Sequence, residues 1–143
     1  ATIGSLTVTG AAEFKGDVTV RGNTSVANLT VNGHIITGGD TPTATAGSAC
    51  SAADVQVSGN DTSGLVTVTT KPGCSGMGDL AKVAFAKAFG AAPRVALTPA
   101  NAEATALKTY IDSGSVSATS FTIATPTTID GSTTYRWYYQ VLQ

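Results

Sequence analysis

The chain of 143 residues is long enough for one ordinary domain, or for a small domain with an extension. Only 12 % of its residues are charged and the net charge is −1, so the sequence offers no basic surface for nucleic acid. No apolar run approaches the roughly 18 residues that a membrane-spanning helix needs. Thr, Ser, Ala, Gly and Val dominate instead, a composition that favours strands and turns and suggests a rigid extracellular or assembly protein.

Residues 1–39 repeat with a period of six. Glycine occupies positions 4, 10, 16 and 22, and Asn28 takes the next such position; both residue types tolerate positive φ. Each unit predicts a short strand of about four residues followed by a turn. The apolar residues that we expect to form the core of the assembled repeat are Leu6, Val8, Phe14, Val18, Val20, Val26, Leu29 and Val31.

The period predicts a stalk in which one unit cannot bury its apolar side chains alone. A single chain would make only about two turns of a hexad β-helix, whereas repeat stacks usually need at least three repeats. Three chains winding together would bury three times as much apolar surface over the same length. We therefore expect an intertwined trimeric β-prism, with a monomeric two-turn β-helix and a meander of short hairpins as the alternatives.

Residues 40–53 are poor in bulky apolar side chains and predict a linker, or a loop pinned by Cys50. Cys50 and Cys74 are the only two cysteines, and both lie in Gly- and Ser-rich loop sequence. With a single histidine, the chain lacks four ligands for a zinc site. We predict a disulfide that stabilises the fold by about 3 kcal/mol and indicates an oxidising compartment. Two unpaired thiols are the alternative.

Residues 54–143 change pattern. Six or seven short alternating segments, separated by turns that contain Gly or Pro, predict strands of an antiparallel β-sandwich. Residues 80–89 alternate as a strand does, with a short helix as the alternative. Residues 102–111 begin with helix-forming residues and end like a strand. The predicted fold class is all-β, with an N-terminal hexad-repeat stalk and a C-terminal sandwich head.

The run LAKVAFAKAFGAAPRVALTPAN, followed by SFTIAT and TTYRWYYQVLQ, resembles the C-terminal β-sandwich of phage tail-fibre proteins and the related H-type lectins. The matching residues are Phe85, Phe89, Pro93, Val95, Leu97, Pro99, Phe121, Trp137 and Tyr139. The segment LTVNGHIITGG also resembles stalk segments of bacterial surface proteins. The resemblance implies a trimer whose head binds carbohydrate or a surface.

The C-terminal aromatic run provides the best candidate for a ligand site. In a strand, Tyr135, Trp137 and Tyr139 point to one side, and Arg136 and Tyr138 to the other, so that one set must form the core. Aromatic rings stack on sugars and supply area at interfaces. We predict ligand contacts from Arg136, Trp137 and Tyr138, and the competing interpretation places Trp137 in the core or in a trimer interface.

No catalytic constellation is evident in the sequence. His34 is the only histidine, and the nucleophile motif G-x-S-x-G is absent. The sequence therefore predicts no enzyme, no catalytic residue, no metal site and no cofactor. Calcium is the alternative, held by turn oxygens around Asp61 and Asp130.

Two functions remain. In the first, the chain is an extracellular fibre or adhesin, on a cell surface or a virion, with its own copies and glycans or a cell surface as partners. In the second, it is the subunit of an extracellular filament, tube or sheath, in which the N-terminal repeat adds strands to the sheet edges of neighbouring subunits.

Overall fold

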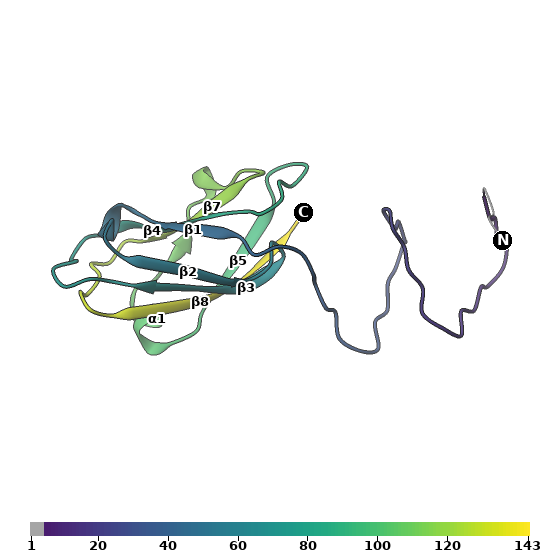
Figure 1. The fold of residues 1–143 in the computed structure, drawn as a ribbon, viewed down its shortest axis with the longest axis horizontal. Helices are drawn as coiled ribbons and strands as arrows, with labels where there is room; N and C mark the ends of the chain where they lie inside the picture. The colour runs from purple at the N-terminus through teal and green to yellow at the C-terminus, as the bar shows by residue number, and fades with distance from the viewer. Residues whose placement is uncertain (1–4) are drawn as a thin grey trace. The chain divides into compact units, whose positions relative to one another are not determined.

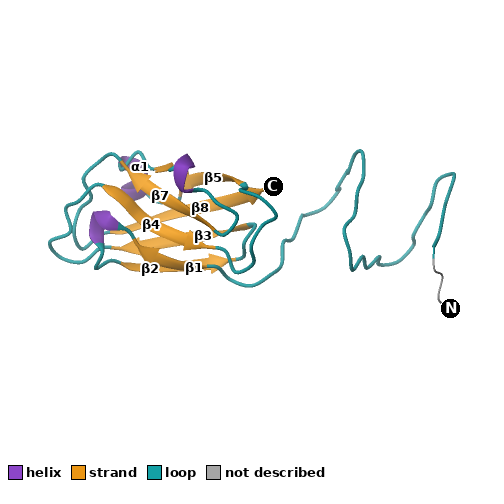
Figure 2. Cartoon of the chain, turned by 90° about the horizontal axis from the view of Figure 1, so that it is seen from above, coloured by secondary structure: helices purple, strands orange, loops and turns teal. Residues whose placement is uncertain are grey.

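The computed structural model describes residues 5–143 and comprises two units, Ala1–Ile35 and Ile36–Gln143. The second unit is a sandwich of two four-stranded antiparallel sheets (Figures 1 and 2). Their strand orders are β1-β4-β7-β6 and β2-β3-β8-β5. The predicted all-β class and the antiparallel sandwich are therefore confirmed. Gly4, the first glycine of the repeat, lies outside the described residues.

Eight strands and three short helices make up the sandwich among the described residues. The first sheet contains β1 (Thr43–Ala46), β4 (Gly78–Ala84), β7 (Ser120–Thr125) and β6 (Tyr110–Ile111). The second contains β2 (Asp54–Gly59), β3 (Ser63–Thr69), β8 (Thr134–Leu142) and β5 (Arg94–Pro99). The helices are α1 (Ala102–Ala106) and the 3-10 helices η1 (Ser48–Cys50) and η2 (Ser113–Ser115). None of the helices described for residues 5–143 has the length and apolar character needed to cross a membrane.

The core lies between the two sheets and is dominated by strand β8. Along β8, buried and exposed residues alternate, and the inward side chains are Tyr135, Trp137, Tyr139 and Val141. The Trp137 ring is fully buried, and its Nε1–H donates to Thr109 Oγ1 at 2.8 Å. Aromatic rings rarely bury without such a partner for their polar atom. This strand therefore holds the two sheets together.

Of two local predictions, the one for residues 102–111 agrees with the structure and the one for residues 80–89 agrees only in part. The expected helix and strand within residues 102–111 are confirmed by α1 and β6. The strand predicted for residues 80–89 ends at Ala84, because the Asp61 carboxylate accepts hydrogen bonds from the backbone N–H groups of Ala86 and Lys87, both at 2.8 Å. The backbone therefore leaves the ladder at these two residues, although the sequence alternates, and it returns at Phe89, whose N–H donates to the Ala118 carbonyl oxygen at 2.9 Å.

Residues 40–53 belong to the sandwich, which corrects the predicted linker. They provide β1, which pairs with β4 from Thr43↔Ala84 to Ala46↔Ala81, and η1, which buries Cys50. An edge strand of small Thr and Ala residues can pair through its backbone without a bulky apolar side chain. The apolar pattern therefore gave no sign of β1, and the compact unit begins at Ile36.

The predicted disulfide between Cys50 and Cys74 is confirmed. It joins the end of η1 to the loop that precedes β4, with 5.4 Å between the two Cα atoms, a separation in the usual range for a bridge. The bridge closes a segment of 24 positions that contains the β2–β3 hairpin. It thereby ties the loops at one end of the sandwich to each other.

Within its described residues, 5–39, the repeat segment forms no helix and no strand. Residues 5–42 contain no strand, and the eight predicted core side chains are all exposed, from 43 % at Val31 to 74 % at Leu29. A monomeric β-helix or a hairpin meander would form its strands within one chain, and the structure has neither over these residues. The predicted strands are thus absent from the single chain, because an extended segment needs a second backbone to pair with.

Removing the disulfide should weaken the head measurably. We expect the double variant Cys50→Ser/Cys74→Ser to lose about 2–4 kcal/mol of unfolding free energy, because its unfolded chain is no longer constrained. Urea unfolding followed by tryptophan fluorescence measures this loss. Reduced wild-type protein should match the variant, and an unchanged urea midpoint in both would contradict the expected contribution of the bridge.

Candidate functional site

The two sheets differ in how their outer faces are covered. Residues 112–119 run beside β7, where the Ser115 hydroxyl accepts a hydrogen bond from the Thr122 N–H at 3.0 Å. The outward-facing Ser120 and Thr122 are consequently only 7 % and 6 % exposed. On the other sheet the outward residues of β8 are exposed from Arg136 to Leu142. The outer face of the β2-β3-β8-β5 sheet is therefore an open surface.

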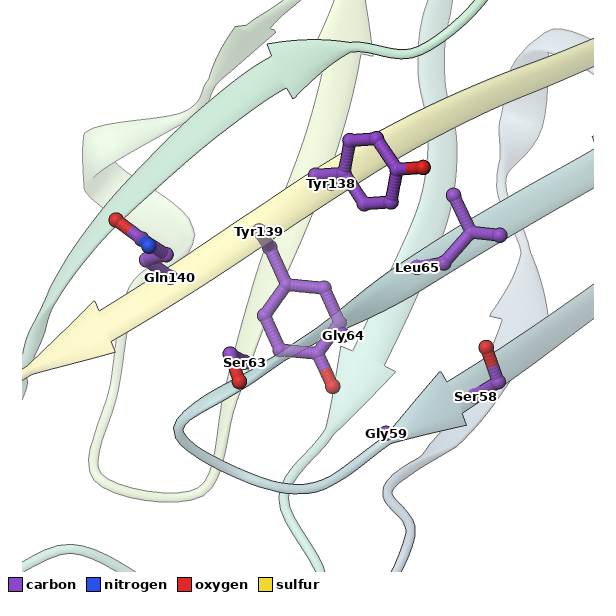
Figure 3. Close-up of a pocket in the computed structure, with 8 residues that line it drawn as sticks. All are labelled: Ser58, Gly59, Ser63, Gly64, Leu65, Tyr138, Tyr139 and Gln140. Carbon is purple, nitrogen blue, oxygen red and sulfur yellow. The ribbon is translucent and has the colours of Figure 1, made fainter. Parts of the chain in front are cut away.

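Tyr138 stands at the middle of this open face. Strand register places Leu65 on one side of it and Thr98 on the other, with Ser58 beyond Leu65. The Tyr138 side chain is 58 % exposed. A hollow of about 470 Å³ lies on its β3 side (Figure 3) and is lined by Ser58, Gly59, Ser63, Gly64, Leu65, Tyr138, Tyr139 and Gln140. A second hollow, of about 310 Å³, lies on the β5 side and is lined by Ala96, Thr98, Tyr138, Tyr139 and Gln140.

Tyr139 is buried in the sandwich and lines one end of the larger hollow. Its hydroxyl donates to the carbonyl oxygen of Asn60 at 2.6 Å. Gly64 lies opposite Tyr139 in the ladder, where a Cβ would collide with the Ser58 carbonyl and the Tyr139 ring. Burial, with a smaller contribution from the Asp61 carboxylate, raises the pKa of Tyr139 to about 12. The hydroxyl therefore stays protonated and remains a donor at physiological pH.

Asn60 connects the same turn to the point where the chain enters the sandwich. Its Nδ2 donates to the Thr37 carbonyl oxygen at 2.7 Å, and its Oδ1 accepts from the backbone N–H groups of Thr62 and Ser63 at 2.9 and 3.2 Å. The hydroxyls of Thr37 and Ser63 lie 3.2 Å apart. Because Ser63 also lines the larger hollow, the chain enters the sandwich beside the open face.

The structure separates the three predicted ligand residues. Arg136 and Tyr138 are exposed on the open face, and Trp137 is fully buried between the sheets. The ligand contact predicted for Trp137 is therefore wrong, and its interpretation as a core residue is right. Sequence reasoning recognised that β8 alternates, but it did not bring Leu65 and Ser58 beside Tyr138. That neighbourhood depends on strand register, for which the sequence carried no signal.

The open face offers apolar contacts and hydrogen-bonding groups. Both hollows are lined by small, apolar, hydroxyl and amide side chains, and Tyr138 and Tyr139 are their only titratable groups. Asp61 and Asp130, around which a calcium site is the alternative prediction, lie in different turns, before β3 and before β8. Over residues 5–143, no three His, Cys, Asp or Glu side chains gather as a metal site would require. The open face therefore offers neutral contacts, an exposed aromatic ring and hydrogen-bonding groups.

Comparison with known proteins gives no match to this chain among protein-family models, curated proteins or solved structures. The resemblance to tail-fibre and H-type lectin sandwiches thus stays a prediction. We infer function from the geometry of the chain.

Changing Tyr139→Phe should lower stability in a pH-dependent way. Loss of the hydroxyl leaves the buried Asn60 carbonyl without this donor, which costs about 1 kcal/mol near neutral pH. Tyr139 has a higher pKa in the folded protein than in the unfolded chain, where it lies near 10. Its contribution is therefore complete below pH 10 and is lost as the pH rises toward 12. Urea midpoints of both proteins at pH 8 and pH 11.5 measure this, and a constant difference would contradict the role of the hydroxyl.

Changing Gly64→Ala should destabilise the sandwich by about 1–3 kcal/mol, because the added methyl group overpacks the contact between Ser58 and Tyr139. The matched control is Gly38→Ala, where a Cβ would meet no atom within 4 Å. Thermal or urea unfolding compares the two variants. Equal stability of the two would show that the Gly64 contact carries no constraint.

Proposed function

We propose that this chain is a non-enzymatic, extracellular protein of the fibre or adhesin type. Residues 1–39 join three copies into a stalk, and the sandwich is a head that binds a surface or a carbohydrate. The observation that carries the proposal is the row of eight apolar side chains in the repeat, each at least 43 % exposed in the single chain. A soluble protein rarely leaves so many large apolar side chains in water unless a partner covers them.

The energetics favour copies of the same repeat as that partner. Burying one Val, Leu or Phe side chain stabilises by about 1.5–3 kcal/mol, so the eight together offset much of the entropy lost when short strands become ordered. Residues 5–42 form no strand within the chain, and strands from other copies would supply the missing backbone partners. Repeats of equal period keep their apolar rows in register, which suits a closed assembly of identical chains.

The layout of the sandwich supports its role as a head. The chain enters beside the β2–β3 turn, where Thr37 bonds to Asn60. The loops joined by Cys50 and Cys74 lie at the opposite ends of β2 and β3. We propose that these loops, at the end of β2 and β3 away from the Thr37 contact, are the part of the head that meets a target surface. The disulfide is itself compatible with an oxidising, extracellular compartment.

The alternative is a subunit of a filament, tube or sheath. Each sheet has an edge strand at both ends of its strand order, and β5 (Arg94–Pro99) is one of these. An extended repeat with alternating apolar residues could add to such an edge of the next subunit through main-chain hydrogen bonds. This reading uses the same exposed repeat but gives an open-ended polymer in place of a discrete trimer.

Solution mass of the full chain distinguishes these functions. We expect light scattering to give three chains, and Val8→Asp/Val20→Asp to reduce the mass to one chain because charge cannot be buried in the repeat core. The matched control is Thr7→Asp/Thr19→Asp, which places the same charges on the other side of the same strands and should leave the trimer intact.

Other outcomes of the same measurement decide against the trimer. A wild-type mass of one chain would overturn the stalk. Long regular polymers in negative-stain images, lost in Val8→Asp/Val20→Asp, would support the filament subunit. Equal effects of the Val and Thr variants would show that the apolar rows do not direct assembly.

A further inference from the structure

The centre of the open sheet face is uncharged and carries an exposed aromatic ring. Its two middle rows, which we call the Tyr138 face, consist of Ser58, Leu65, Tyr138, Thr98, Ser63, Gln140 and Ala96. None of these side chains carries a charge at neutral pH. The charged residues of the same face, Asp54, Arg136 and Arg94, belong to the rows outside these two. Interface cores are likewise depleted of charge and enriched in Tyr.

The shape of the Tyr138 face suits a partner that carries the same surface. The exposed Tyr138 ring stands between hollows of about 470 and 310 Å³, which small neighbours such as Ser58 and Ala96 leave open. A protruding aromatic ring beside a hollow can enter the hollow of the next copy. Repeated head to tail around an axis, such a contact closes a ring of identical subunits. Aromatic anchors in pockets of this kind commonly carry most of the binding energy at an interface.

The position of the Tyr138 face points to the same partner. Asn60 ties Thr37 to the β2–β3 turn, and Ser63 contacts Thr37 while it also belongs to the face. Chains joined through residues 1–39 would therefore bring these regions of their heads close together. Short tethers raise the effective concentration to the millimolar range, so even a weak contact forms. The neutral centre of the face also lets identical copies meet without like-charge repulsion.

We propose that the Tyr138 face is the contact between the heads of neighbouring copies, with Tyr138 of one head in the hollow of the next. This inference rests on the proposed function, because it takes the joining of chains through residues 1–39 as its starting point. It assigns Tyr138 a second copy of this chain as its partner, in place of the sugar that the aromatic run suggested.

Thiol protection in the full-length protein tests this contact. Ser58→Cys places a nearly isosteric thiol in the larger hollow, and Ser113→Cys places one at an exposed position of η2, outside the Tyr138 face. The native cysteines are bonded to each other and do not react. We expect a bulky maleimide to modify Ser58→Cys about tenfold more slowly, or slower still, in the assembled protein than in the Val8→Asp/Val20→Asp background, because it must wait for local opening. Ser113→Cys should react at the same rate in both.

A further variant tests the role of the ring itself. Tyr138→Ala, added to Ser58→Cys, should restore fast modification while light scattering still gives three chains, because the repeat holds the copies together. Continued protection without the ring would overturn the contact. Equal reactivity of Ser58→Cys in the trimer and in the charged variant would also overturn it and leave the face open to a ligand such as a carbohydrate. A one-chain wild-type mass would instead remove the proposed function on which the contact rests.

Discussion

The alternation of strand β8 is the constraint on which the rest of the sandwich depends. β8 pairs with β3 on one side and β5 on the other, so it sets the register of two of the other three strands in its sheet. Its inward residues fill the core, and Trp137 is fully buried there. The alternate residues of β8, which include Arg136 and Tyr138, face the solvent. A shift of one residue would exchange these two sets and expose the core, so the position of Tyr138 follows from the burial of Trp137.

A chain of hydrogen bonds carries this order from the core to the surface. The Tyr139 hydroxyl donates a hydrogen bond to the carbonyl oxygen of Asn60, and the Asn60 side chain donates one to the carbonyl oxygen of Thr37. Gly64 leaves the space that the Tyr139 ring occupies. The route by which the chain enters the sandwich is therefore fixed by the same strand that forms the core.

The two parts of the chain differ in whether their large apolar side chains are buried. The sandwich buries its large side chains between its own sheets, aided by the disulfide. The repeat has apolar residues at regular spacing but no second layer of its own, and they remain exposed. The sandwich thus forms its core within one chain, whereas the apolar side chains of the repeat would be buried only against other molecules. This division is the basis of the proposed assembly through the repeat.

The sequence by itself determined the all-β class, the antiparallel sandwich, the disulfide and the two-sided character of β8, because composition, turn residues and a period of two are local properties. It did not reveal β1 in residues 40–53, since an edge strand of Thr and Ala carries no apolar pattern. It also placed Trp137 among ligand residues, because alternation alone does not say which side is the core. Only the tertiary structure decided that point and brought Leu65 and Ser58 beside Tyr138, because residues far apart in the chain become neighbours through strand register, which long-range pairing sets.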